Sequence, residues 1–304
     1  MFEFLLKILN FSKIWWIAIR PNTLWVSLCP IMVVTALCYN RLSVVNILLS
    51  LLGILSLQIG ANLTNDYYDT INGADNADRV GPLRVMQAKL VSESAMRKAI
   101  MFVYTIAFFV GVHFGVYIHS FLFILMSVSI CASYLYTGGS KPYAYYGLGD
   151  PMAFLFFGPI AVASAFYIQT YEISLFAIYI GIAIGCFSIS LITANNWRDI
   201  EGDRRAGKKT LAVFFGPRFS RFEYIFFIFL PYIIFIHVLY LRDVSLGLSL
   251  LTLSCLGITW YSTLKEIWVF DRIELDHLKN LLKKTGKAFL IYSIYLSFIL
   301  FRTK

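Results

Sequence analysis

The chain has 304 residues, of which 59% are hydrophobic and only 14% are charged, and its mean hydropathy is +0.72. An ordinary soluble domain carries about 25% charged residues, so this composition argues against a water-soluble fold. The formal net charge of +9 does not indicate nucleic-acid binding, because the basic residues are divided among loops between hydrophobic segments and form no exposed stripe. We therefore expect one integral membrane domain over residues 1–304.

The first segment, residues 1–14, is mostly apolar, and Lys7 and Lys13 interrupt it. It lacks the small-residue exit site of a cleavable signal peptide. The pattern favours an amphipathic helix that lies in the membrane interface.

Nine apolar runs follow, and a helix that crosses a bilayer needs about 20 such residues. The pattern predicts an all-α integral membrane protein with about nine transmembrane helices. The expected spans are 22–39, 45–66, 99–116, 121–136, 152–171, 175–195, 222–240, 245–263 and 288–301.

The distribution of basic residues predicts the orientation, since cytoplasmic loops collect Lys and Arg. With the N-terminus in the cytoplasm, nearly all of the 26 basic residues fall on the cytoplasmic side. The exceptions are Arg41, Arg242, Arg302 and Lys304. We therefore expect a multi-pass protein of the inner (plasma) membrane, with the ends of the second and sixth spans on the cytoplasmic side.

Acidic residues crowd those two helix ends. They are Asp66, Asp69, Asp75 and Asp78 in the first group, and Asp199, Glu201 and Asp203 in the second. Carboxylates at the edge of the hydrocarbon repel one another and lose hydration, so such residues are functional candidates. Helical spacing predicts one face for Asn62, Asp66 and Asp69, and another for Asn195, Asp199 and Asp203. Glu201 points away from the second face and is expected to be solvated.

The donor atoms in these groups indicate the ligand. Carboxylate and amide oxygens without nearby His or Cys suit Mg²⁺ or Mn²⁺. Basic residues that can bind phosphate oxygens follow each group: Arg79, Arg84 and Lys89 after the first, and Arg204, Arg205, Lys208 and Lys209 after the second. Arg84 and Lys89 are also compatible with a solvated position at the membrane interface, and for these two residues we favour that position over phosphate binding. Acid, metal and base together predict a diphosphate pocket.

A metal-bound diphosphate is a good leaving group, and breaking its bond to an allylic carbon produces a delocalised cation. Such a cation needs dry, polarisable walls. Aromatic residues in and beside the loop after the fourth span could supply them: Tyr134, Tyr136, Tyr143, Tyr145, Tyr146 and Phe156. Individually, each is also compatible with packing or with a place at the membrane interface.

The two acidic segments resemble the motifs NDxxDxxxD and DxxxD of the UbiA-type intramembrane prenyltransferases. Residues 199–203 (DIEGD) match the second motif, whereas in the first motif Gly73 stands where the last Asp is expected and Asp75 comes two residues later. This variant is similar to that of the family's 1,4-dihydroxy-2-naphthoate polyprenyltransferases of menaquinone biosynthesis. The segments 20–24 (RPNTL), 136–139 (YTGG) and 146–150 (YGLGD) also resemble that branch. The resemblance extends from about Arg20 to Pro217.

The resemblance implies nine helices around a central cavity open to lipid. It also implies that Mg²⁺ is held by Asn65, Asp69, Asp75, Asn195, Asp199 and Asp203, with Asp66 assisting. The catalytic aspartates would be Asp66, Asp69, Asp199 and Asp203, and the diphosphate would be met by Arg20, Asn65, Arg79, Lys141, Asn195 and Lys208. The substrates implied are a polyprenyl diphosphate and an aromatic acceptor, which for a naphthoate loses its carboxyl group as CO₂. Asp150 is a candidate for handling the acceptor.

Other readings remain open from the sequence. The acceptor could be 4-hydroxybenzoate, homogentisate, haem or another naphthoate isomer. A CDP-alcohol phosphotransferase also uses paired Asp residues with Mg²⁺, but its signature beginning Asp-Gly is absent. A transporter is the non-enzyme alternative, although a carrier places its charges near mid-membrane and these groups lie at helix ends.

Overall fold

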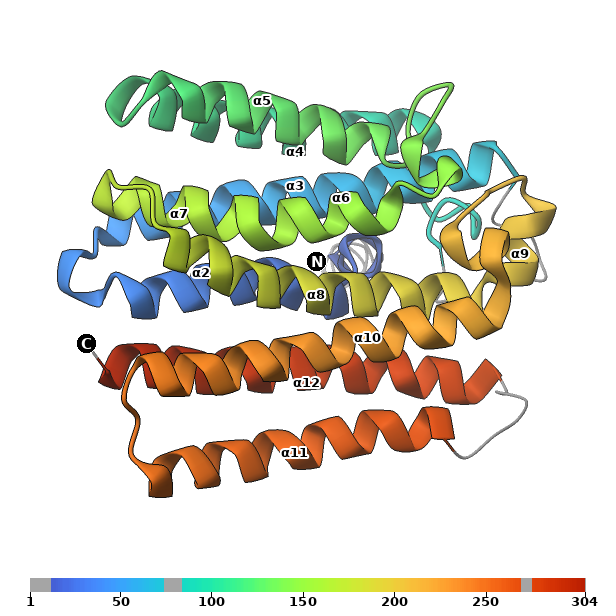
Figure 1. The fold of residues 1–304 in the computed structure, drawn as a ribbon. Helices are drawn as coiled ribbons and strands as arrows, with labels where there is room; N and C mark the ends of the chain where they lie inside the picture. The colour runs from blue at the N-terminus through green and yellow to red at the C-terminus, as the bar shows by residue number, and fades with distance from the viewer. Residues whose placement is uncertain (1–11, 74–83, 269–274, 304) are drawn as a thin grey trace, which may run out of the picture.

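The computed structural model describes residues 12–73, 84–268 and 275–303. Most of the expected interfacial helix 1–14 therefore lies outside the described residues, as do Asp75, Asp78 and Arg79. Long helices lie side by side and alternate in direction along the chain (Figure 1). The α-helices of the described residues are α2 (Trp25–Leu37), α3 (Val44–Ile71), α4 (Glu93–Tyr117), α5 (Ser120–Leu135), α6 (Gly149–Leu155), α7 (Ala161–Thr170), α8 (Leu175–Arg198), α9 (Ile200–Arg205), α10 (Leu211–Leu241), α11 (Leu246–Trp268) and α12 (Leu275–Arg302). Short helical turns are η1 (Pro21–Thr23), η2 (Tyr39–Arg41), η3 (Tyr143–Tyr146) and η4 (Phe156–Ile160).

Each predicted span coincides with a helix, except that 152–171 runs across α6, η4 and α7, and the all-α fold class is confirmed. Among the described residues, seven helices are long and apolar enough to cross a membrane, counting Gly149–Thr170 as one. The segment 12–23 and α2 are bent by 56° and would together make an eighth. Helix α5 is apolar but has only 16 residues, about 24 Å at 1.5 Å per residue. The predicted nine is therefore approximate.

Several helices begin at a side-chain cap that the polar loop sequence supplies. Ser43, Ser92, Ser174 and Thr210 each accept a hydrogen bond from the backbone N–H three residues later. Such a cap satisfies one of the amides left free at a helix start and contributes about 1 kcal/mol. The caps fix where α3, α4, α8 and α10 begin.

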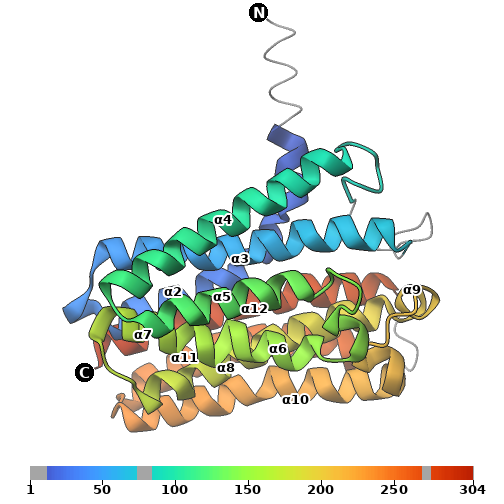
Figure 2. The same ribbon diagram turned by 90° about the horizontal axis from the view of Figure 1, so that it is seen from above.

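Helix α8 packs against α6, η4, α7, α10 and α12, and more than half of its residues are buried. The Phe187 ring stacks on that of Phe289 with centroids 4.9 Å apart and an angle of 11° between the planes. Figure 2 shows α3 and α4 toward one edge of the molecule and α10 at the opposite edge. In both views the C-terminal end of α3 and the short α9 lie at the same end of the bundle.

Between α6 and α7 the helix is interrupted at η4. Gly158 has φ −103° and ψ −106°, and Pro159 follows it. A Cβ on Gly158 would lie 2.6 Å from the carbonyl oxygen of Gly181 and 2.6 Å from the Cα of Gly185. Small residues let two membrane helices approach at backbone distance, so these glycines set how closely α6 and α7 approach α8.

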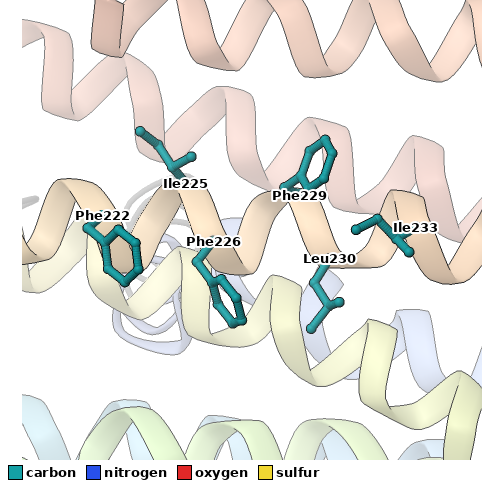
Figure 3. A pocket seen from close by; sticks show the side chains of 6 residues that line it. All are labelled: Phe222, Ile225, Phe226, Phe229, Leu230 and Ile233. Carbon is teal, nitrogen blue, oxygen red and sulfur yellow. The ribbon is translucent and has the colours of Figure 1, made fainter.

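The outer face of α10 carries an apolar groove lined by Phe222, Ile225, Phe226, Phe229, Leu230 and Ile233 (Figure 3). The Phe222 side chain is 66% exposed and that of Phe226 is 50% exposed. Exposing this apolar surface to water is unfavourable, whereas contact with the acyl chains of lipids is not. The groove is consistent with a helix that faces lipid.

Candidate active site at the end of the helix bundle

Asn65 and Asp69 lie one turn apart at the C-terminal end of α3. The Asn65 side-chain amide donates to Asp69 Oδ2 at 2.6 Å. The side-chain oxygen of Asn65, Oδ1, accepts hydrogen bonds from Arg84 at 2.7 Å and from Arg20 at 3.0 Å. Two guanidinium groups from distant parts of the chain therefore meet on one amide oxygen.

Asp69 is only 2% exposed and is surrounded by donors. Its Oδ1 accepts from Lys208 Nζ at 2.8 Å and from the Tyr145 hydroxyl at 3.1 Å, and Arg84 lies 3.8 Å from its Oδ2. The Lys208 ammonium also lies 5.1 Å from the centre of the Tyr145 ring. Charge-assisted hydrogen bonds of this kind are about twice as strong as neutral ones. The carboxylate is held by partners from three separate segments.

Lys208 also connects the two acidic motifs, because its Nζ lies 3.9 Å from Asp203 Oδ1. Burial raises the pKa of Asp203 to about 7, against the lowering effect of Lys208. The negative charges of Asp199 and Asp69 raise it further. A cation placed beside a buried carboxyl group with a raised pKa stabilises the ionised form of that group.

Asn195 and Asp199 are held by Arg198 at the end of α8. The guanidinium donates to Asp199 at 2.6 and 2.7 Å and to Asn195 Oδ1 at 2.7 Å. Helix α8 ends at Arg198, and Asp199 has φ −99° and ψ 9°. The predicted face of Asn195, Asp199 and Asp203 is therefore divided between α8 and α9, a break that the spacing did not reveal.

The predicted face on α3 is also modified. Asp66 accepts hydrogen bonds from the backbone N–H groups of Val85 and Met86, at 3.1 and 3.3 Å. Asn62 donates to the carbonyl oxygen of Ile19 and to Thr23. Both residues anchor neighbouring segments, because the loop after α3 and the N-terminal segment pack on this part of the helix.

Arg84 corrects a sequence-based interpretation. Its sequence context favours a solvated interface position, but its side chain is only 7% exposed and contacts Asn65 and Asp69. Arg198 and the role of Tyr145 at Asp69 were likewise not predicted. Of the three, only Arg198 had a local signal, since it lies between Asn195 and Asp199 in the sequence.

Three further predicted residues can be placed. Arg20 reaches the site from an unusual backbone position, with φ 54° and ψ 69°. Such strain in a non-glycine residue is concentrated at functional sites. Lys141 is exposed on the loop after α5, and among the described residues it forms no ion pair with Asp69, Asp199 or Asp203. Glu201 is exposed as expected and pairs with Arg204 at 2.8 Å.

The donor set fits a hard divalent cation. Asp69, Asp199 and Asp203 offer carboxylate oxygens, and Asn65 and Asn195 offer amide oxygens, which are the ligands that Mg²⁺ prefers. Within the described ranges, no three His, Cys, Asp or Glu side chains are already gathered as metal ligands. Lys208, Arg84 and Arg198 lie among the carboxylates and balance their charge. These three cations would also complement a bound diphosphate.

The UbiA prenyltransferase family model matches residues 27–293. This chain belongs to the UbiA prenyltransferase family. The match includes both acidic motifs and every long helix from α2 to α12, so the resemblance noted from the motifs is confirmed over most of the chain.

Curated UbiA relatives share the enzyme class. A 1,4-dihydroxy-2-naphthoate octaprenyltransferase of Mycobacterium tuberculosis is 36% identical over 212 residues, which cover 69% of this chain and 72% of the relative. The protein of the same name in Escherichia coli K12 is 35% identical over 223 residues, with 67% and 69% covered. Human UbiA prenyltransferase domain-containing protein 1 is 30% identical over 243 residues, with 78% and 71% covered.

Solved UbiA structures share the fold. A UbiA homologue from Archaeoglobus fulgidus, bound to DMAPP and Mg²⁺, superposes with a TM-score of 0.64 at 17% identity and covers 95% of this chain and 99% of its own. A UbiA homologue from Aeropyrum pernix in its apo form gives 0.66 at 14% identity, with 92% and 97% covered. At these identities the likeness shows the arrangement of helices alone.

The Arg84→Gln variant is expected to weaken binding of a diphosphate substrate about ten- to a hundredfold, because a buried charge-assisted hydrogen bond contributes about 1.5–3 kcal/mol. Arg84→Lys keeps the charge but loses the fork of donors and is expected to recover only part of the affinity. Titration of the purified protein with a prenyl diphosphate measures both. Arg204→Gln, which removes an exposed guanidinium of the same bundle end, is the matched control, and equal losses in Arg84→Gln and Arg204→Gln would contradict a specific role for Arg84.

Proposed function

We propose that this protein transfers a polyprenyl group from a polyprenyl diphosphate to 1,4-dihydroxy-2-naphthoate, with Mg²⁺ as cofactor and release of CO₂ and diphosphate. The product would be the demethylmenaquinol of menaquinone biosynthesis. The observation that carries the proposal is the junction of the two acidic motifs through Lys208, which contacts Asp69 at 2.8 Å and lies 3.9 Å from Asp203. The names of the curated relatives support the naphthoate acceptor.

Mg²⁺ would be held by Asn65, Asp69, Asn195, Asp199 and Asp203, and we propose the same for Asp75. When bound, the metal neutralises charge on the diphosphate and makes it a better leaving group. In the absence of the metal, Lys and Arg side chains balance the negative charge of these buried carboxylates. A diphosphate would take over Lys208, Arg84 and Arg20 as partners, and we propose Arg79 and Lys141 as further contacts.

The roles of the other residues follow from their contacts. Asp66 would act by positioning, because it fixes the backbone of Val85 and Met86 next to Arg84. Tyr145 donates to Asp69 and flanks Lys208, so its ring would form a wall of the pocket. An aromatic wall stabilises a developing allylic cation and keeps water from it.

We also propose the plasma membrane as the location, with the N-terminus and both acidic motifs on the cytoplasmic side. The excess of Lys and Arg in the loops on that side supports this orientation. A polyprenyl tail would then extend from the site between the helices into the bilayer, where its apolar surface costs nothing to accommodate.

The experiment is prenyl transfer by the purified full-length protein in detergent, with geranylgeranyl diphosphate as the donor. With 1,4-dihydroxy-2-naphthoate and Mg²⁺ we expect a prenylated naphthoquinol and one CO₂ per turnover, and loss of activity with EDTA that added Mg²⁺ restores. Turnover with 4-hydroxybenzoate and none with the naphthoate would overturn the acceptor. Absence of diphosphate release with either acceptor would overturn prenyl transfer itself.

A further inference from the structure

A second group of buried acids lies outside the Asp-rich motifs. Asp150, at the start of α6, is 2% exposed, and both of its carboxylate oxygens are buried without a hydrogen-bond partner other than its own backbone amide. A carboxylate in such a place costs several kcal/mol unless it is neutralised or bound. The residue therefore points to a ligand or a shared proton.

The charged residue that acts most strongly on Asp150 is another acid. Glu223 of α10 is 6% exposed, and its carboxyl lies close enough for the two negative charges to repel. The hydroxyl of Thr193 on α8 lies beside Glu223. No Lys or Arg of the described ranges forms an ion pair with either acid. Two buried acids that repel each other, with no cation between them, are more stable when one of the two carboxyl groups is protonated.

Tyr136 connects this pair with the candidate active site. Its hydroxyl interacts electrostatically with the carboxylates of Asp150, Asp69 and Asp203. A Cβ on Gly149 would lie 3.3 Å from the Tyr136 ring, which therefore packs on the backbone at the start of α6. Tyr136 therefore packs at the start of α6, where Asp150 lies, and interacts electrostatically with Asp69 and Asp203 of the candidate active site.

We propose that Asp150 and Glu223 form the proton-transfer site for the aromatic acceptor, with Asp150 contacting an acceptor hydroxyl and Glu223 positioning and sharing its proton. This inference rests on the proposed function. The ligand class is a hydroxylated aromatic carboxylate, placed with a hydroxyl toward Asp150 and its reacting carbon toward the diphosphate.

The step balances without another reactant. The allylic C–O bond breaks and its electron pair leaves with the diphosphate, while the ring carbon that bears the carboxylate forms the new C–C bond. The hydroxyl proton passes to Asp150 as that oxygen becomes a carbonyl. Loss of CO₂ returns an electron pair to the ring, and the proton returns from Asp150 to the oxygen. General acid–base assistance of this kind contributes about 10²- to 10⁴-fold.

The test measures kcat and KM for the naphthoate, and separately the affinity for geranylgeranyl diphosphate, in the full-length protein and in Asp150→Asn, Asp150→Glu and Glu223→Gln. We expect Asp150→Asn to lower kcat about 10²- to 10⁴-fold with the affinity for the diphosphate unchanged. Asp150→Glu is expected to recover part of kcat, and Glu223→Gln to lower kcat less than Asp150→Asn. Glu172→Gln, which removes an exposed acid paired with Arg41 elsewhere in the protein, is expected to match the unmodified protein.

Each outcome decides between named alternatives. An unchanged kcat in well-folded Asp150→Asn, with naphthoate turnover by the unmodified protein, overturns the inference and leaves the proposed function standing. Equal losses of diphosphate affinity and kcat in all three variants show a structural role and also overturn it. If Asp150→Asn does not fold, Asp150→Glu and Glu223→Gln decide by the same two measurements. No naphthoate turnover by the unmodified protein is instead a failure of the proposed function.

Discussion

Asp69→Asn is expected to lower kcat/KM for prenyl transfer about 10²- to 10³-fold, the range measured when one preorganised electrostatic group is removed from an active site. Asp69 is the residue on which Asn65, Tyr145 and Lys208 all converge. The substitution keeps the shape but removes the charge that holds Lys208 and would bind the metal. It also leaves a buried ammonium without its nearest anion.

Glu201→Gln is the control for that variant, because Glu201 lies in the second motif but is exposed and pairs with Arg204. Its activity is expected to stay within about twofold of the unmodified protein, since exposed ion pairs contribute about 0–1 kcal/mol. Initial rates at several Mg²⁺ concentrations, with thermal unfolding of each variant, separate a catalytic loss from a folding defect. A rate for Asp69→Asn close to that of Glu201→Gln would contradict the assignment of the site.

Gly158→Ala adds a single methyl group and is expected to lower the free energy of unfolding by about 1–3 kcal/mol. The added Cβ would lie 2.6 Å from backbone atoms of Gly181 and Gly185, and backbone cannot move aside as a flexible side chain can. Separating η4 from α8 would also displace α6, which begins at Gly149 and carries Asp150. We expect lower activity as well as a lower midpoint of thermal unfolding.

Gly257→Ala supplies the matched comparison, because Gly257 is also inside a long apolar helix. Among the described residues, no side chain or neighbouring segment lies within 4 Å of the place that its added methyl group would take. Alanine is the better helix former, so this variant is expected to unfold at the same temperature or slightly higher. Midpoints are compared at one heating rate, since unfolding of membrane proteins in detergent is commonly irreversible. Equal midpoints for the two variants would show that η4 and α8 do not pack at backbone distance.

Hydropathy and motif spacing were enough to predict the helical membrane fold and the two acidic motifs. Hydropathy over about 20 residues is a local property, and a helix satisfies its own backbone hydrogen bonds in lipid, so each span could be located without its neighbours. The spacing predicted a common helical face for Asn62, Asp66 and Asp69, and of these Asp69 takes its place in the site, with Asn65 one turn before it. The family's motifs then indicated the chemistry of the pocket.

Which side chains meet at those motifs depends on tertiary packing. Arg84 comes from a loop and Lys208 from the segment after α9, yet both lie beside Asp69. The residues that flank each of them in the sequence do not indicate this contact. Asp66 lies next to Asn65 in the motif but holds the backbone of Val85 instead of joining Asp69. The reason is physical: periodicity fixes the direction of a side chain on its own helix, whereas its partners depend on the packing of segments far apart in the chain. The electrostatic interaction of Asp150 on α6 with Glu223 on α10 is of the same kind, because it depends on both helices packing on α8.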